Sequence, residues 1–268
     1  FMGRLKPVGK FRIPGADLLT YLHMCYHKQD TATMEELLVR YENILDTVPF
    51  VPTYYENGFD FKASPVITAS KPRSFQGMQW GLIPWWAKSA DDAADLRLRT
   101  LNAISEQIYD KPAFKDSAKD GKRCLIPCTG FFEWRWFKGG KVKYPYFIHC
   151  RDEKIFSIAG LWSSWTDKST GEMRDTYTVL TTRANPLLEK IHNSKKRMPV
   201  ILPREYEKDW LNPLLSKDDV LALCEPIDDQ RLEAYTISRL ITDRKVDNKD
   251  AAEVCKRFEY PELTLMDA

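Results

Sequence analysis

The chain has 268 residues, of which 43% are hydrophobic and 12% aromatic, so it can bury a core and is neither disordered nor fibrous. Its 40 lysines and arginines nearly balance 38 aspartates and glutamates, so an anionic partner has to be met by a local basic patch. The apolar runs fall far short of the roughly 20 residues that a membrane-spanning helix needs.

Six cysteines are too sparse for a disulfide framework in a chain of this length, and they indicate reduced thiols in a cytoplasmic compartment. Cys124 and Cys128 form a C-x-x-x-C pair, but neither a second pair nor a His-x-x-x-His follows at zinc-site spacing. We therefore expect no metal and no cofactor.

The first 23 residues are basic, and their short apolar run over 18–22 is too brief for the core of a secretory signal. Met24 reads like an internal start, because Phe1 is no natural initiator. Residues 1–23 are thus an N-terminal extension of open origin: artificial, a start placed too early, or a pro-segment that is removed. A single domain is expected over 24–258, followed by a tail over 259–268.

Helical spacing of apolar residues predicts an amphipathic helix over 32–46, with Thr31 or Thr33 as its N-cap. Short apolar runs bounded by glycine and proline then predict strands. These strands cover 65–69, 78–83, 123–127, 131–137, 144–150, 154–162, 175–181, 198–202 and 234–238. Further helices are predicted over 103–109, 112–118, 185–191, 204–211 and 217–223. The pattern indicates one α+β domain, built on a curved mixed β-sheet or open barrel with flanking helices.

Two segments carry groups suited to proton transfer. Glu133 stands between aromatic residues in G-F-F-E-W, where desolvation would raise its pKa, although strand alternation pointing it to solvent is the commoner outcome. His192 ends a predicted helix, where it is either a general base or, more commonly, a C-terminal cap.

Two further segments offer binding groups. Trp85 and Trp86 present aromatic faces that stack on bases in some proteins, yet tryptophan is more often buried in a core. Asn102 precedes a predicted helix and is by default its N-cap.

Taken together, the motifs resemble those of a known family. In chain order they are Met-Cys at 24–25, Pro65, W-G-L-I-P at 80–84, N-A at 102–103, K-P-A-F at 111–114, R-C-L-I-P at 123–127, G-F-F-E-W at 130–134, and I-H at 191–192 with R-M-P-V-I-L at 197–202. This ordered set, from Met24 to about Asn248, resembles the SOS response-associated peptidase (SRAP) family, whose members are also called abasic-site processing proteins.

The resemblance implies a chemistry for Cys25. In that family the initiator methionine is removed, and the N-terminal cysteine attacks the ring-opened aldehyde of an abasic site in single-stranded DNA. An α-amine with a pKa of about 7.7–8.0 forms a Schiff base, which the adjacent thiol traps as a thiazolidine, a covalent DNA–protein cross-link. If residues 1–24 stay attached, the amine is an amide and the chain is inert toward abasic DNA.

The resemblance also implies roles for other residues. Asn102 orients the N-terminal residue or the sugar, Glu133 transfers protons on the amine and ring oxygen, and His192 shuttles the proton of ring opening or of a lyase step. The residues implied to contact DNA are Pro65, Trp85, Trp86, Thr181 and Arg197. Arg97, Arg99, Arg183, Lys195 and Lys196 complete a basic groove or, as the plainer alternative, a solvated charged face.

Three departures from the family pattern stand out. Tyr26-His27-Lys28 follows the cysteine in place of Gly-Arg-Phe, and Ile104 replaces an arginine that would contact phosphate. An insertion, Asn193-Ser194-Lys195-Lys196, separates His192 from Arg197.

The sequence is therefore compatible with three functions. The first is a DNA-repair enzyme, acting as a monomer, that cross-links to abasic sites through Cys25. The alternative is a cysteine-type peptidase acting on its own leader or on other proteins, against which stands the lack of a known protease motif. The third is a non-catalytic binder of single-stranded DNA, which would tolerate loss of the Cys25 thiol.

Overall fold

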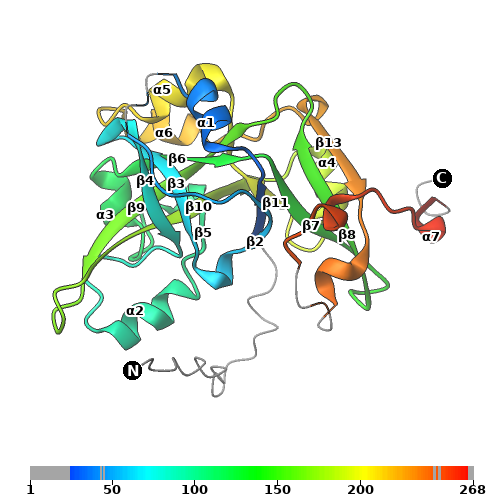
Figure 1. Ribbon diagram of the computed structural model, residues 1–268, viewed down its shortest axis with the longest axis horizontal. Helices are drawn as coiled ribbons and strands as arrows, with labels where there is room; N and C mark the ends of the chain where they lie inside the picture. The colour runs from blue at the N-terminus through cyan, green and yellow to red at the C-terminus, as the bar shows by residue number, and fades with distance from the viewer. Residues whose placement is uncertain (1–24, 43, 45, 244–245, 247–248, 265–268) are drawn as a thin grey trace, which may run out of the picture.

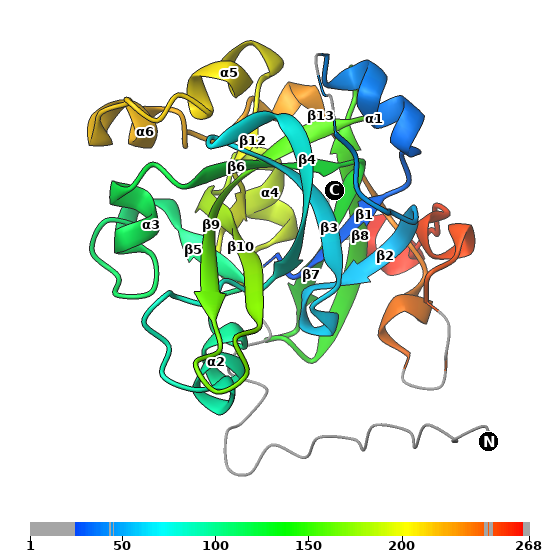
Figure 2. The same cartoon turned by 60° about the vertical axis from the view of Figure 1, so that its left-hand side comes forward.

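Five strands close into a barrel at the centre of the molecule (Figures 1 and 2). They are β3 (Ala63–Thr68), β4 (Lys71–Trp80), β6 (Arg123–Cys128), β9 (Phe156–Thr166) and β10 (Met173–Arg183). The order β4-β3-β6-β9-β10 is antiparallel throughout, and a short parallel pairing of β10 with β4 completes the ring. The computed structural model describes residues 25–264 except 43, 45, 244–245 and 247–248. The predicted α+β domain with a closed or nearly closed mixed sheet is confirmed.

Three short strands extend the barrel. β5 (Asn102–Ile104) and β11 (Arg197–Pro199) pair with β10, and β12 (Ile201–Leu202) pairs with β9.

A second, antiparallel sheet lies beside the barrel (Figure 1). Its order is β13 (Leu232–Thr236), β8 (Val142–Cys150), β7 (Gly130–Phe137), β1 (His27–Asp30) and β2 (Thr53–Asn57). Alternation along β7 sends Phe131 into the core shared with the barrel and Phe132 into a smaller core on the opposite face. The two sheets therefore enclose one continuous interior between them.

The helices are short and cap the ends of the sheets. α1 (Met34–Arg40), α5 (Glu207–Trp210) and α6 (Lys217–Ala222) lie at one end of the barrel, and α2 (Ala90–Arg97) lies at the other (Figures 1 and 2). The remaining helices are α3 (Lys115–Lys119), α4 (Pro186–Ile191) and α7 (Pro261–Thr264). None of the helices within the described part of the chain is long and apolar enough to cross a membrane.

The first helix is shorter than the predicted range 32–46. Thr33 is the N-cap, and it forms a capping box with Glu36. The helix ends at Tyr41, whose backbone leaves the helical region at ψ 83° while its buried hydroxyl hydrogen-bonds Ser157 Oγ at 2.7 Å. Burial of this side chain therefore outweighs the helical spacing that continues beyond it.

The helix predicted over 103–109 is wrong. Residues 102–104 form β5, and a 3₁₀ turn follows at Ser105–Gln107. β5 pairs in parallel with β10, so the tertiary pairing overrides local propensity. Asn102 is consequently a strand residue and not a helix N-cap. Similarly, the strand predicted over 78–83 stops at Trp80, because Gly81 has a left-handed φ of 97°.

Several elements were not predicted, among them α2, β1, β2 and α7. α2 buries only Ala93 and Arg97, so it has no apolar stripe. β1 reads His-Lys-Gln-Asp, a polar run that does not resemble a strand, although three of its four residues are buried. β2 was missed as well.

The two ends of the predicted domain differ in what the structure describes. In the predicted tail, Tyr260 and Leu263 are buried against Tyr144 of β8. The predicted extension over 1–23 lies outside the described residues.

Candidate active site

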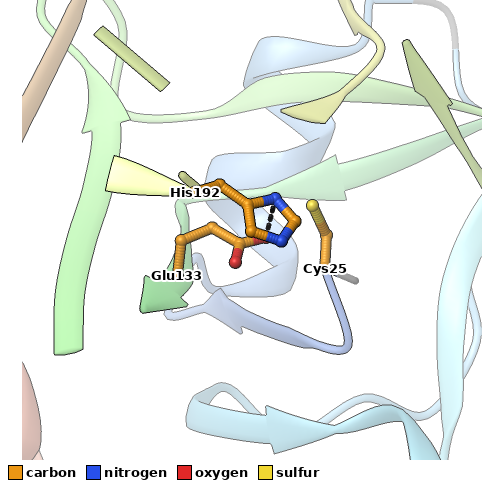
Figure 3. Close-up of side chains that lie close together, drawn as sticks. All are labelled: Cys25, Glu133 and His192. Atoms are coloured by element: carbon orange, nitrogen blue, oxygen red, sulfur yellow. Dashed lines mark ion pairs between the residues drawn. The ribbon is translucent and has the colours of Figure 1, made fainter. Parts of the chain in front are cut away.

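Three reactive side chains converge between the two sheets. Cys25 comes just before β1, Glu133 lies in β7, and His192 caps the C-terminus of α4; their side chains point toward one another (Figure 3). They are 4%, 2% and 2% exposed. Their sulfur, carboxylate oxygen and ring nitrogen lie within 4.8 Å of one another, and within the described chain this is the one group of three or more His, Cys, Asp or Glu side chains close enough to share a metal ion.

Cys25 is placed by the pairing of β1 with β7. Lys28 and Gln29 pair with Phe131 and Gly130 in antiparallel register, which, continued backward, brings the chain before β1 alongside Glu133. Asn102 Nδ2 donates a hydrogen bond to the Cys25 carbonyl oxygen at 3.1 Å. Asn102 is therefore beside Cys25, as the resemblance implied, although its backbone belongs to β5.

The Cys25 thiol is held protonated. Burial, followed by the nearby Glu133 charge, raises its pKa well above the ordinary value, although Arg197 opposes the rise. A Glu133 carboxylate oxygen lies within 4.8 Å of the sulfur. A base that removes the thiol proton is consequently already in place.

Glu133 faces the interior. It shares the face of Phe131, toward the barrel, so the commoner expectation of a solvent-facing glutamate is wrong. Burial raises its pKa, while the positive charge on protonated His192 and the nearby Cys25 thiol oppose that rise. Its Oε1 accepts no hydrogen bond from the described residues. The carboxyl group can thus change protonation state nearer to neutrality than an exposed glutamate.

His192 both caps a helix and enters the site. Its backbone N–H donates to Leu188 O at 2.7 Å, while its Nδ1 lies 2.7 Å from the Arg197 carbonyl oxygen and 3.7 Å from Glu133 Oε1. Because a carbonyl only accepts, Nδ1 carries the proton, and in the neutral ring Nε2 carries the lone pair.

The insertion after His192 ties two parts of the site together. Asn193 Oδ1 accepts from the Trp136 backbone N–H at 2.9 Å, and its Nδ2 donates to the Trp136 carbonyl at 2.8 Å. This pairing, at the end of the strand that carries Glu133, clamps the histidine loop onto β7. The insertion is visible in the sequence, but its contact with Trp136 could not be predicted from it.

The residues after Cys25 also have defined contacts. His27 packs on Tyr55 and Trp134, with ring centroids 5.1 and 4.9 Å apart. Lys28 Nζ pairs with Glu56 Oε2 at 2.7 Å, and both side chains are buried. The charge of Lys28 is therefore held inside the protein.

Arg197 lies at the edge of the site and holds a carboxylate. Its guanidinium donates to both oxygens of Glu106 at 2.8 Å and to the Thr181 carbonyl at 2.6 Å. Sequence reasoning missed Glu106, for which the only signal is its position in the N-A-I-S-E segment.

The other implied DNA contacts are spread over the barrel. Trp85 is 60% exposed and donates to Asp116 Oδ2 at 2.9 Å, whereas Trp86 is half-buried. Pro65 in β3 and Thr181 in β10 are buried, and the Thr181 hydroxyl donates to Ala103 O at 3.4 Å. DNA contact by these four residues stays a prediction, and Trp85 has the most accessible surface for it.

Several predicted groove cations already have partners. Arg97 is buried, donates to Trp80 O at 3.1 Å and lies over the Phe61 ring. Arg99 pairs with Asp95, Arg183 with Glu225, and Lys196 with Glu189. A continuous groove of unpaired cations is thus not formed by this set.

Comparison with known proteins gives consistent matches. The family model described as SOS response associated peptidase (SRAP) matches residues 24–244. The abasic site processing protein YoqW of Bacillus subtilis is 37% identical over 177 residues, covering 66% of this chain and 75% of its own. The abasic site processing protein HMCES of Gallus gallus is 32% identical over 162 residues, covering 53% and 46%. A crystal structure of a Bacteroides thetaiotaomicron protein aligns with a TM-score of 0.81 at 37% identity, covering 88% of this chain and all of that one.

Proposed function

Because the chain belongs to the SOS response associated peptidase family, we propose that it processes abasic sites in single-stranded DNA by cross-linking to them through Cys25. The observation that carries the proposal is the buried cluster of Cys25, Glu133 and His192, with Asn102 on the Cys25 carbonyl. The names of the relatives support the substrate, and the cluster supports the chemistry.

The reaction requires Cys25 to be N-terminal. Its neutral amine adds to the C1′ aldehyde of the opened sugar, and loss of one water gives an imine. The thiol then adds across the C=N bond: sulfur bonds to carbon, and the thiol proton ends on nitrogen. The product is a thiazolidine, and the net change is the loss of one water.

Glu133 and His192 are proposed to move the protons. Glu133 has a carboxylate oxygen within 4.8 Å of the thiol, so it takes the proton as sulfur attacks and, when protonated, supplies one to the departing hydroxyl. The lone pair on His192 Nε2 is suited to removing the hydroxyl proton of the closed sugar, which opens the ring. Asn102 holds the Cys25 carbonyl and thereby sets the direction of both nucleophiles.

DNA is proposed to bind along the edge that carries Arg197. A backbone phosphate would take the place of the Glu106 carboxylate on this guanidinium, since both anions match its bidentate geometry. Trp85 offers the exposed ring on which a neighbouring base stacks, and Pro65, Trp86 and Thr181 are proposed to add further contacts. One copy of the chain supplies all these groups, so we propose that it acts as a monomer.

A peptidase step on the preceding peptide bond would supply the free amine. The Cys25 sulfur attacks the carbonyl carbon of residue 24, the C–N bond breaks, the amine takes up the thiol proton, and water hydrolyses the resulting thioester. The proximity of thiol and carboxylate favours this step as well, because it places a proton acceptor near the sulfur before any DNA binds.

The deciding experiment is intact mass of protein that begins at Cys25 and of the full chain, with single-stranded DNA holding one abasic site. A stable adduct is expected on the Cys25 form, lost in Cys25→Ala and kept in Cys224→Ala, a matched control at a buried cysteine in a separate core. No adduct on a verified Cys25 terminus would refute the proposal. Self-cleavage of the full chain, abolished by Cys25→Ala, would support the peptidase step independently.

A further inference from the structure

The Cys25 cluster contains the donor set of a zinc site. It offers a sulfur, an imidazole nitrogen and a carboxylate oxygen within 4.8 Å of one another, from three elements that are far apart in sequence. Sulfur and nitrogen donors with one carboxylate are ligands that Zn²⁺ selects in proteins, whereas Mg²⁺ prefers oxygen alone.

We propose that Cys25, Glu133 and His192 bind Zn²⁺, and that the α-amine of Cys25 supplies the fourth ligand when this residue is N-terminal. The inference rests on the proposed function only for that free amine. Sulfur and amine of one cysteine close a five-membered chelate ring, so the terminal residue alone contributes two of four tetrahedral positions. Binding releases the thiol proton and any ammonium proton to solvent, without oxidation or reduction.

The orientation of His192 suits a ligand. Its Nδ1 donates to the Arg197 carbonyl at 2.7 Å, so in the neutral ring the lone pair that can bind a metal is on Nε2. Metal-bound histidines usually donate their other N–H to a backbone carbonyl or carboxylate in this way, which fixes the ring and its tautomer.

Glu133 supplies an oxygen aimed into the cluster. Its side chain is 2% exposed, and Oε1 accepts no hydrogen bond from the described residues, a costly arrangement for a buried carboxylate. One thiolate and one carboxylate balance the two charges of Zn²⁺, so the filled site is neutral. Tetrahedral bonds of about 2.0–2.3 Å place ligand atoms roughly 3.4–3.6 Å apart, so any pair of ligand atoms near the 4.8 Å limit has to approach when zinc binds.

Zinc and the abasic aldehyde would compete for the same two atoms. A thiazolidine consumes both the amine and the thiol of Cys25, so a cross-linked protein loses two of four ligands. Conversely, bound Zn²⁺ blocks both nucleophiles. The site would thereby make cross-linking sensitive to free zinc and protect the thiol until zinc is withdrawn.

The test is titration of protein beginning at Cys25 with zinc chloride, followed by native mass and calorimetry, and with cobalt chloride, followed by absorption. One Zn²⁺ per chain is expected, and Co²⁺ should give the thiolate charge-transfer and tetrahedral bands. Magnesium chloride is the negative control. Cys25→Ser and His192→Ala should each weaken zinc binding by more than the roughly 10- to 100-fold that loss of a supporting contact costs. Cys224→Ala should bind as wild type, and circular dichroism verifies that each variant is folded.

The outcomes separate the two proposals. Absence of stoichiometric zinc, or zinc binding unchanged in folded Cys25→Ser and His192→Ala, overturns the site even if the DNA adduct forms. Zinc binding without any adduct would sustain the site and refute the proposed function. Pre-formed DNA adduct that still binds zinc at full strength would also overturn the inference.

Discussion

Two buried pairs of a carboxylate with a basic side chain flank the first strand, and they differ in how completely they are satisfied. Lys28 and Glu56 lie 2.7 Å apart, and Ser64 donates to the same carboxylate. His192 and Glu133 lie 3.7 Å apart, and Glu133 Oε1 lacks a hydrogen bond from the described residues. The Glu56 carboxylate is therefore satisfied by Lys28 and Ser64, whereas Glu133 Oε1 can still accept a hydrogen bond from another group.

The electrostatic consequences differ in the same sense. For Lys28, burial lowers the pKa, but Glu56 and the acidic groups around it together outweigh burial and raise the pKa, so the ammonium stays charged. For Glu133, burial outweighs His192 and raises the pKa, so its charge is the more easily lost. A fixed charge pair holds strands together, while an underpaired carboxyl group is available to exchange protons. The following predictions test this division.

The largest effect is expected from Glu133→Gln. The amide keeps the shape but accepts no proton, so the cross-linking rate should fall by about 10²- to 10⁴-fold, measured in single turnover with abasic single-stranded DNA. An unchanged rate in folded protein would contradict the proposed role.

The same variant has a pH signature in stability. A raised folded pKa means that the native state binds more protons, so wild type loses stability as pH rises from 4.5 through that pKa. Glu133→Gln should lack this loss and be the more stable protein above this window, as measured by urea unfolding across pH. Parallel curves of unfolding free energy against pH for the two proteins would show that folding does not raise the pKa of Glu133.

Lys28→Met should have the opposite effects. The protein should become less stable, while the molecules that stay folded should cross-link at the wild-type rate. It leaves Glu56 buried without its partner, which costs about 3–5 kcal/mol of unfolding free energy. Pairing it with Glu56→Gln removes the uncompensated charge, so the double variant should recover part of the loss in urea unfolding. A single variant as stable as wild type would break the comparison.

Asn193→Ala tests the contact that holds the loop after His192 against β7, the strand that carries Glu133. Loss of its two hydrogen bonds to Trp136 should cost about 0.5–1.5 kcal/mol and slow cross-linking, while DNA affinity is retained. Asn193→Asp keeps the acceptor and should retain more of the rate. Equal rates in Asn193→Ala and wild type would show that the clamp does not position His192.

The smallest effect is expected from Glu106→Gln. It removes the anion that a phosphate has to displace from Arg197, so affinity for intact single-stranded DNA should rise about two- to fivefold, as expected for a half-exposed ion pair. Fluorescence anisotropy at fixed salt measures it, with Glu189→Gln, which faces Lys196, as matched control. Weaker binding would mean that Glu106 orients Arg197 instead of competing for it.

Elements with a clear local hydrophobic pattern can be predicted from the sequence. Elements that form only because of tertiary contacts with distant segments cannot. Most strands of the barrel are foreseeable because they are apolar runs between turn residues. β1 is not, since the buried charge of Lys28 is acceptable only opposite Glu56, which lies elsewhere in the chain. β5 likewise becomes a strand only because the edge of β10 accepts it.

The site was predictable as a set of residues but not as a geometry. Motif order singled out Cys25, Glu133 and His192, whereas pattern alone assigned Glu133 to solvent and Asn102 to a helix cap. Their actual positions depend on the face that β7 turns to the barrel and on a loop contact from Asn193. Neither is encoded locally, so residue-by-residue reasoning could not reach them.

The parallel closure of β10 onto β4 has a consequence for biosynthesis. Contacts between such distant segments form slowly, because much chain entropy is lost before they contribute. Cys25 leaves the ribosome early, but its two partners follow more than a hundred residues later, and His192 follows β10 itself. The Cys25 thiol therefore lacks its base during most of translation. Its activation, and any self-cleavage that depends on it, can occur only after the domain has folded.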